Sequence, residues 1–330
     1  MEILTGPVED FLYQQIPPEV WHYTTLTGLQ GILSSGTIWA TEARSTNDET
    51  EFVHTRDIAL EYLKTSERPD KHFEFALTEA YKVIESVFNK GALSVNETEV
   101  FIASFSAAED LKSQWSDYAD RHCGVSIGFD LRYIRPPKGS GIGVTFAPCV
   151  YEQADKKSLI RSALSHFVQQ SAKNHSQVTD KNWVATQMKD WAMVQRIYGI
   201  PDFDRAAFQR NLDDKIGTEI LSSGVRTAFD LLRLASHCKN RLFSEEKEWR
   251  LALNRSKGRT GVSEQVQYRG PNGTIPYICS NLFQPIGRLP ITRIMLGPLC
   301  NIRNEVEKLV SDSGYAVHVI GSNIPLRYPA

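Results

Sequence analysis

The chain has 330 residues, of which 41% are hydrophobic and 23% charged, and 37 Lys and Arg residues nearly balance 39 Asp and Glu residues to give a formal net charge of −2. This composition is typical of a globular protein with a large core, and the near-neutral charge excludes a uniformly basic nucleic-acid-binding protein, although not a local basic groove. Widely spaced cysteines without a C-x-x-C pair argue against a disulfide framework, and neither a secretory leader nor a run of about 18 apolar residues is visible. We therefore expect a cytoplasmic protein with no membrane span.

The first elements predict a strand–helix–strand unit. The helix begins near a threonine cap (Thr25 or Thr27), carries its apolar residues on one face and ends at Gly36, which suits a left-handed stop. Strand-like segments at 21–23 and 37–41 flank this helix.

Helices and strands then alternate irregularly along the chain. Further helices are expected near 50–64, 73–89, 111–120 and 302–311, further strands near 99–106, 124–130, 248–253, 274–278, 291–296 and 315–320, and loops at 45–49 and 136–143. Residues 153–240 carry helical spacing without strand signals, which predicts a helical insertion. The irregular alternation predicts a single α+β domain over residues 1–330 rather than a doubly wound sheet.

Widespread catalytic motifs are missing. The sequence has no P-loop, no G-x-S-x-G nucleophile elbow and no H-E-x-x-H pair, and we expect no metal site. A glycine cluster at 139–143 follows a Pro-Pro loop instead of a strand, so it does not predict a dinucleotide-binding fingerprint.

A segment near residue 248 concentrates charge. Strand alternation would place Glu246, Glu248 and Arg250 on one side, where two carboxylates and a guanidinium suit either a functional site or a wholly exposed face. The surrounding stretch 239–259 holds seven basic residues against three acidic ones, which predicts either a phosphate-backbone track or a solvated loop. The basic residues are Lys239, Arg241, Lys247, Arg250, Arg255, Lys257 and Arg259.

Three other segments carry candidate site residues that also have ordinary structural explanations. His22 lies between two aromatic residues at the end of a strand, which is typical of a half-buried structural histidine as well as of a catalytic one. Trp115 and Tyr118 lie three residues apart on a helix, a spacing common in core or rim packing. Asn47 suits a helix cap.

Six segments, taken together in order and spacing, resemble a widespread bacterial family of unknown function. They are WHYTT, GLQGILSSGTIWAT, STNDETEF, FSAAEDLKSQWSDY…GVSIGFD, EEKEWRL and ITRIMLGPLCN, and the resemblance touches nearly the whole chain except residues 153–235. The pattern H-x-T followed by L-x-x-I-L-x-x-G is also similar to the opening of His-Tyr-Glu-type ADP-ribosyltransferases, among them DNA-targeting toxins, and RNA 2′-phosphotransferases begin in a comparable way. EKEWR at 246–250 resembles the x-x-Glu-aromatic strand that carries the last catalytic residue of those toxins.

The resemblance implies an ADP-ribosyltransferase-like split mixed β-sheet with a helical insertion. It also implies an NAD-dependent mono-ADP-ribosyltransferase that modifies DNA, RNA or protein, with duty as a toxin or phage-defence effector and an antitoxin or inhibitor protein as a further partner. The alternatives are a non-catalytic module that binds a nucleotide or a partner, and an RNA 2′-phosphotransferase, for which paired arginines around a phosphate are lacking.

The same resemblance implies roles for particular residues. Glu248 would stabilise the oxocarbenium-like state and hold the ribose 2′-hydroxyl, Glu246 would orient the acceptor, and His22 would bond the nicotinamide-side ribose. Tyr23 or Thr24 would hold the carboxamide through the backbone. The full set of expected NAD-binding residues is His22, Tyr23, Thr24, Arg44 or Arg250 at the pyrophosphate, Asn47, Ser104 as part of a serine strand, and Trp115 or Tyr118 stacked on the nicotinamide.

Overall fold

The computed structural model describes residues 7–45, 50–88, 98–134, 142–180, 184, 186, 205–256, 265–269, 273–280 and 288–326. Its strands are β1 (Val20–Thr24), β2 (Ile38–Glu42), β3 (Thr98–Ser106), β4 (Val125–Phe129), β5 (Ile142–Pro148), β6 (Glu248–Ser256), β7 (Gln267–Arg269), β8 (Ile275–Ser280), β9 (Ile291–Leu296) and β10 (His318–Gly321). Its α-helices are α1 (Pro7–Leu12), α2 (Leu26–Ser35), α3 (Thr50–Thr65), α4 (Lys71–Phe88), α5 (Lys112–Tyr118), α6 (Gln153–Thr179), α8 (Arg205–Ala235) and α9 (Arg303–Asp312). The fold is α+β, as the sequence predicts.

The described strands form one mixed sheet that divides at β3. Along one edge β3 pairs with β6 over its whole length, and β6 pairs in turn with β5. The other edge of β3 is shared, because β2 pairs with it at residues 101–102 and β1 only at Ser106. From this fork, β1 leads to β4, β9 and β10, whereas β2 leads to β8 and β7. The described pairings are antiparallel except that of β9 with β10.

Helix α2 joins the two arms of the fork, and local chemistry determines where it begins and ends. The Thr25 side chain accepts a hydrogen bond from the backbone N–H of Gly28, and Gly36 adopts a left-handed conformation with φ of 63°. These are the cap and the stop that the sequence predicts, since Thr favours the N-cap and Gly adopts positive φ without strain. The short helix therefore returns the chain from β1 to β2 across the fork.

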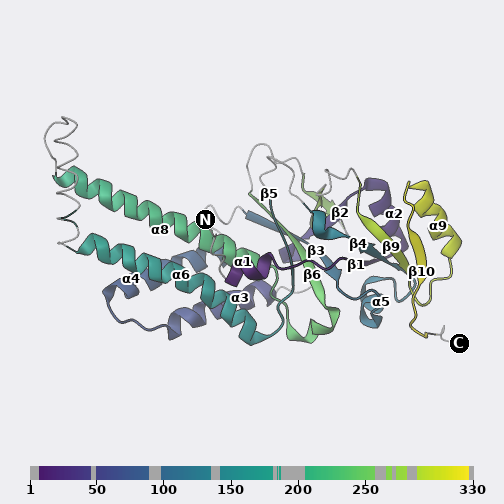
Figure 1. Cartoon of the computed structure of the whole chain (residues 1–330), viewed down its shortest axis with the longest axis horizontal. Helices are drawn as coiled ribbons and strands as arrows, with labels where there is room; N and C mark the ends of the chain where they lie inside the picture. Colours follow the sequence, from purple (N-terminus) through teal and green to yellow (C-terminus); the bar gives the residue numbers. More distant parts are fainter. Residues whose placement is uncertain are drawn as a thin grey trace.

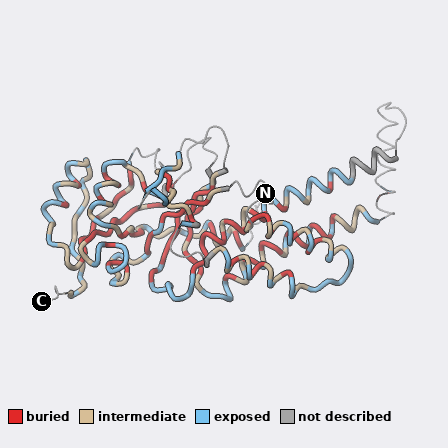
Figure 2. Tube along the Cα trace, turned by 180° about the vertical axis from the view of Figure 1, so that it is seen from behind, coloured by how far each residue is buried: buried red, intermediate tan, exposed pale blue. Residues whose placement is uncertain are grey.

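Four long helices, α3, α4, α6 and α8, form a bundle beside the sheet (Figure 1). The bundle has its own apolar core, which reaches the sheet through Val100, Ile102 and Ala147. The tube of Figure 2 shows buried segments running from the sheet into the bundle. Within the stretch 153–240, for which the sequence predicts helix, the described residues form α6 and α8, while most of 181–204 lies outside the described part. The bundle is not built from that stretch alone, because α3 and α4 pack on it from residues 50–88.

Three elements, α1, β7 and β5, are not predicted from the sequence. Helix α1 lies in what reads as a lead-in segment, and β7 is only three residues long with all side chains exposed, so neither has a usable hydrophobic period. The predicted loop at 136–143 is wrong in its last two residues, which begin β5, while its earlier residues lie outside the described part. Within the described residues, no helix combines the length and apolarity needed to cross a bilayer.

Candidate functional site

A cleft of about 1140 Å³ opens at the fork of the sheet. Its walls come from β1, α2, β2, β3, α5, β6 and β7, together with the 3₁₀ helix η4 (Arg241–Glu246) that precedes β6. His22 and Glu248 are far apart in the sequence, yet both line this cleft because β1 and β6 lie on opposite edges of β3. The volume lies slightly above the roughly 300–1,000 Å³ typical of small-molecule pockets, so the cleft has room for an extended ligand.

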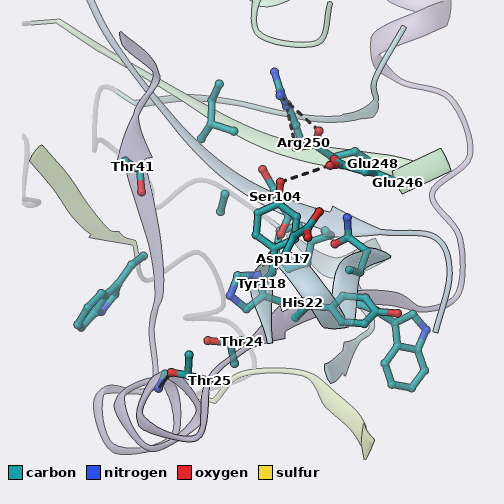
Figure 3. Close-up of a pocket in the computed structure, with 18 of the residues that line it drawn as sticks. His22, Thr24, Thr25, Thr41, Ser104, Asp117, Tyr118, Glu246, Glu248 and Arg250 are labelled. Carbon is teal, nitrogen blue, oxygen red and sulfur yellow. Dashed lines mark hydrogen bonds and ion pairs between the residues drawn. The ribbon is translucent and has the colours of Figure 1, made fainter. Parts of the chain in front are cut away.

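Four charged side chains form one buried ion-pair cluster at one end of the cleft. Figure 3 shows three of them, Glu246, Glu248 and Arg250. Lys239 Nζ lies 2.6 Å from Glu248 Oε2 and also contacts Glu246 Oε2. Arg250 donates from Nε to Glu248 Oε1 at 2.9 Å and from Nη2 to Oε2 at 3.3 Å. All four residues are buried, so each charge depends on its partners and not on water for stabilisation.

This arrangement corrects two sequence predictions. Glu246 does not lie on the strand with Glu248, because it ends η4 and Lys247 follows in a left-handed conformation with φ of 46°. The exposed-face interpretation is wrong, because both glutamates and Arg250 are buried.

The predicted basic track is also wrong for three of its members, while Lys257 and Arg259 lie outside the described residues. Lys239 and Arg250 form ion pairs within the buried cluster, and Arg255 pairs with Glu99. Arg241 and Lys247 are exposed.

Glu248 is held in its ionised form. Burial alone would raise the pKa of this carboxyl, but the charges of Arg250 and Lys239 and their hydrogen bonds lower it to about 2 from an ordinary 4.5. A carboxylate offers about four acceptor sites, of which these three hydrogen bonds use three. One acceptor site on Oε1 therefore stays open.

The depressed pKa of Glu248 predicts a specific acid sensitivity. Such a group stabilises the fold above its unfolded pKa and loses that contribution as the pH falls toward its folded value. Between pH 4.5 and pH 2 we expect this group to remove about 3 kcal/mol from the free energy of unfolding. Urea titrations across this range, on the native chain and on Glu248→Gln, measure the contribution. Equal slopes of stability against pH in both proteins would contradict it.

His22 occupies the fork itself. Its Nδ1 lies 3.0 Å from the backbone oxygen of Ser104, which sits between the part of β3 that pairs with β2 and the part that pairs with β1. Because a carbonyl only accepts, Nδ1 carries the proton and Nε2 is left as an acceptor. Burial lowers the pKa of the ring despite the Ser104 hydrogen bond, so His22 is neutral at pH 7.

Four of the other residues expected at the site do line the cleft: Tyr23, Thr24, Ser104 and Tyr118. The Tyr118 hydroxyl donates a hydrogen bond to Glu246 Oε1 at 3.3 Å. Thr24 packs so closely on α2 that a Cβ at Gly28 would lie 2.0 Å from its hydroxyl oxygen.

Trp115 does not take part in the cleft, which corrects its predicted stacking role. The ring is fully buried, meets Tyr23 edge-on at 4.8 Å between centroids, and donates from Nε1 to Asp110 at 2.7 Å. It therefore anchors α5 in the core. This is the packing role that its three-residue spacing from Tyr118 also predicts. Asn47 and the side chain of Arg44 lie outside the described residues.

Several cleft residues were missed by sequence reasoning. Lys239 appeared only as one member of a basic run, although it joins the two glutamates. Trp39 had a usable signal, because strand alternation separates it from buried Ile38 and Ala40. Arg269 had none, since it lies on the three-residue strand β7.

The geometry thus defines an α+β protein with a cleft at the fork of a mixed sheet, lined by apolar residues and by a charged cluster at one end. Residues 114–251 match the model of a family described as a protein of unknown function (DUF2971). The matched segment carries the whole buried ion-pair cluster but not His22, and it includes the 153–235 stretch that the sequence resemblance omits. No curated protein and no solved structure matches the chain.

Proposed function

We propose that this protein is an NAD⁺-dependent mono-ADP-ribosyltransferase with a nucleic acid or a protein as acceptor. The observation that carries the proposal is the placement of an ionised Glu248 and a neutral His22 in one cleft large enough for a dinucleotide. A buried carboxylate without a proton suits a reaction in which positive charge develops on a sugar.

The reaction breaks the bond between C1′ of the ribose and the nicotinamide nitrogen. Nicotinamide leaves with the bonding electron pair, and the positive charge that develops on the ribose is stabilised by the Glu248 carboxylate. The acceptor then forms a bond to C1′ and gives up its proton to Glu246, which passes it to solvent. The open acceptor site on Glu248 Oε1 suits the ribose 2′-hydroxyl.

The neighbouring side chains suit the nicotinamide half of the substrate. His22 Nε2, as an acceptor, can take a hydrogen bond from a ribose hydroxyl. Tyr118 is 44% exposed and offers a ring face to the planar nicotinamide, with its hydroxyl directed to Glu246. Burial and the Glu246 charge raise the pKa of this phenol to about 12, which keeps it protonated as a donor.

A large acceptor is favoured by the rim of the cleft. Leu242 and Phe243 on η4 line the cleft and are 84% and 39% exposed, beside the proposed acceptor-orienting Glu246. Exposed apolar side chains at a site mouth are typical of contacts with another macromolecule. Duty as a toxin or phage-defence effector, with an antitoxin or inhibitor as partner, is part of the same proposal.

Labelled NAD⁺, incubated with separate pools of DNA, RNA and protein, tests the proposal directly. We expect nicotinamide release and transfer of label to one of the pools, which identifies the acceptor. No release of nicotinamide with any pool, at protein concentrations that bind NAD⁺, would contradict the proposal.

A Glu246→Gln variant in the same assay separates the two glutamates. Because Glu246 is assigned to the acceptor and not to the ribose, we expect nicotinamide release to persist while transfer of label falls by roughly 10²-fold or more, the usual cost of losing one acid–base group. Equal loss of both would contradict this division of roles.

One observation favours an alternative, a non-catalytic nucleotide-binding module. Both oxygens of Glu248 are already bonded to Lys239 and Arg250, as in a purely structural ion pair. This alternative predicts that NAD⁺ raises the melting temperature of the protein without being cleaved.

A further inference from the structure

The wall of the cleft on the β2–β8–β7 arm carries an aromatic and cationic group that the proposed chemistry does not use. The rings of Trp39 and Tyr277 lie 4.8 Å apart between centroids at an angle of 32°. The Arg269 guanidinium carbon lies 5.8 Å from the Trp39 ring and 5.6 Å from the Tyr277 ring. Trp39 is 37% exposed and Tyr277 is buried behind it, so Trp39 is the ring available for stacking.

Arg269 is held in place but keeps donors for a ligand. Its Nη2 donates to Thr41 Oγ1 at 2.6 Å, and a guanidinium has five N–H donors. Among the described residues no carboxylate pairs with it, whereas Lys239 and Arg250 are neutralised by the two glutamates. The positive charge of the cleft is therefore concentrated on the Arg269 wall.

Figure 3 places this arm away from the proposed reaction centre. Thr41, the partner of Arg269, lies on a strand across the cleft from Glu246, Glu248 and Arg250, with Ser104 and Tyr118 between. A ligand that spans the cleft would thus meet a carboxylate at one end and a cation beside an aromatic ring at the other.

The floor of the cleft is open at Gly31 on α2. A Cβ built at this glycine meets nothing within 4 Å, although the residue lines the cleft, whereas one at Gly28 collides with Thr24. A helical glycine costs about 1 kcal/mol relative to alanine. Space for a ligand is a physical reason for this glycine.

We infer that the Trp39–Arg269 wall binds the adenosine diphosphate part of NAD⁺, with Trp39 stacked on the base and Arg269 on the phosphates. The inference rests on the proposed function, which supplies the dinucleotide. An aromatic face takes any nucleobase, and a guanidinium bonds phosphate oxygens in pairs. This replaces the sequence-based assignment of Arg250 to the pyrophosphate, since Arg250 is buried and paired with Glu248.

Calorimetric titration with ADP and with adenosine tests the two contacts separately. We expect Trp39→Ala to weaken the binding of both ligands about tenfold or more, the loss expected for one stacking contact. Arg269→Gln should weaken ADP about tenfold and leave adenosine unchanged, because only ADP carries phosphates. Gly31→Phe should abolish binding by filling the cleft.

Matched variants control for effects on folding. Gly217→Phe is the matched control for Gly31→Phe, because a Cβ at Gly217 on α8 also meets nothing within 4 Å and this residue does not line the cleft, so a normal ADP affinity is expected. Tyr81→Ala and Arg56→Gln remove an exposed aromatic ring and a partly exposed guanidinium from the helical bundle, and should bind ADP normally. Weakening in these controls equal to that in the Trp39 and Arg269 variants would overturn the assignment.

The outcomes separate this inference from the proposed function. If ADP binds through Trp39 and Arg269 but NAD⁺ is not cleaved, the subsite stands and the transferase proposal fails. If NAD⁺ is cleaved with the same KM in Trp39→Ala and Arg269→Gln, the transferase proposal stands and the subsite is wrong. Binding of a single-stranded oligonucleotide without any binding of ADP would also overturn the inference.

Discussion

A Glu248→Gln variant is expected to lose NAD⁺ cleavage by a factor of about 10² to 10³, the usual cost of removing one group that stabilises transition-state charge. Glutamine keeps the shape of the side chain and an oxygen acceptor for Arg250, but it removes the negative charge that would face the ribose. Release of nicotinamide, followed over time at saturating NAD⁺, measures the loss. An unchanged rate would refute the role of Glu248.

The fold of this variant must be checked because Glu248 is buried and paired with two cations. Retained ADP affinity and a cooperative unfolding transition would separate a chemical defect from a structural one. Glu99→Gln is the matched control, because Glu99 pairs with Arg255 in the same sheet without lining the cleft, and its cleavage rate should equal that of the native chain.

Lys239→Met is expected to cause the largest loss of stability, about 3–5 kcal/mol of the free energy of unfolding, as when one partner of a buried ion pair is removed. Methionine fills much of the same volume but leaves Glu246 without a cation and Glu248 with Arg250 as its remaining cationic partner. Urea unfolding at pH 7 measures the change. The exposed Lys82, which pairs with Glu79 on the surface of α4, provides the control, and Lys82→Met should change stability by less than about 0.5 kcal/mol.

The cause of that loss can be tested with a second substitution. Adding Glu246→Gln to Lys239→Met removes the carboxylate left without a cation, so the double variant should be more stable than Lys239→Met alone. The deficit of the single variant should also shrink at acid pH, where protonation neutralises the carboxylates. Additive losses and a deficit independent of pH would assign the effect to packing.

Local signals explain why much of the fold could be predicted from the sequence. The strand–helix–strand unit rests on a threonine cap and a left-handed glycine, Thr25 and Gly36, whose preferences hold in any tertiary context. Strand alternation such as that of Ile38, Trp39 and Ala40 in β2 and apolar periods such as that of α4 report which face is buried. Strand β7 has only three residues, which are too few to show a hydrophobic period, so the sequence does not predict it.

The candidate site could be predicted less completely. The family resemblance predicted His22 and Glu248 as site residues. Side-chain spacing could not decide whether Trp115 lies in the core or in the cleft, because helix periodicity shows which residues share a face but not what covers that face. Lys239 illustrates the other limit. A basic residue in a basic run predicts a surface, and only the approach of η4 and β6 around it creates a buried partner for two carboxylates.

The sequence by itself determined the α+β class, most of the helices and strands, and the residue types available for chemistry, because these depend on neighbours along the chain. Tertiary structure decided where β1 and β2 separate along β3, which side chains meet in the resulting cleft, and which charges are neutralised there. Those outcomes depend on strand pairing between segments far apart in the chain and on burial. The same basic residue type is therefore an internal counter-ion at Lys239 and a candidate phosphate ligand at Arg269.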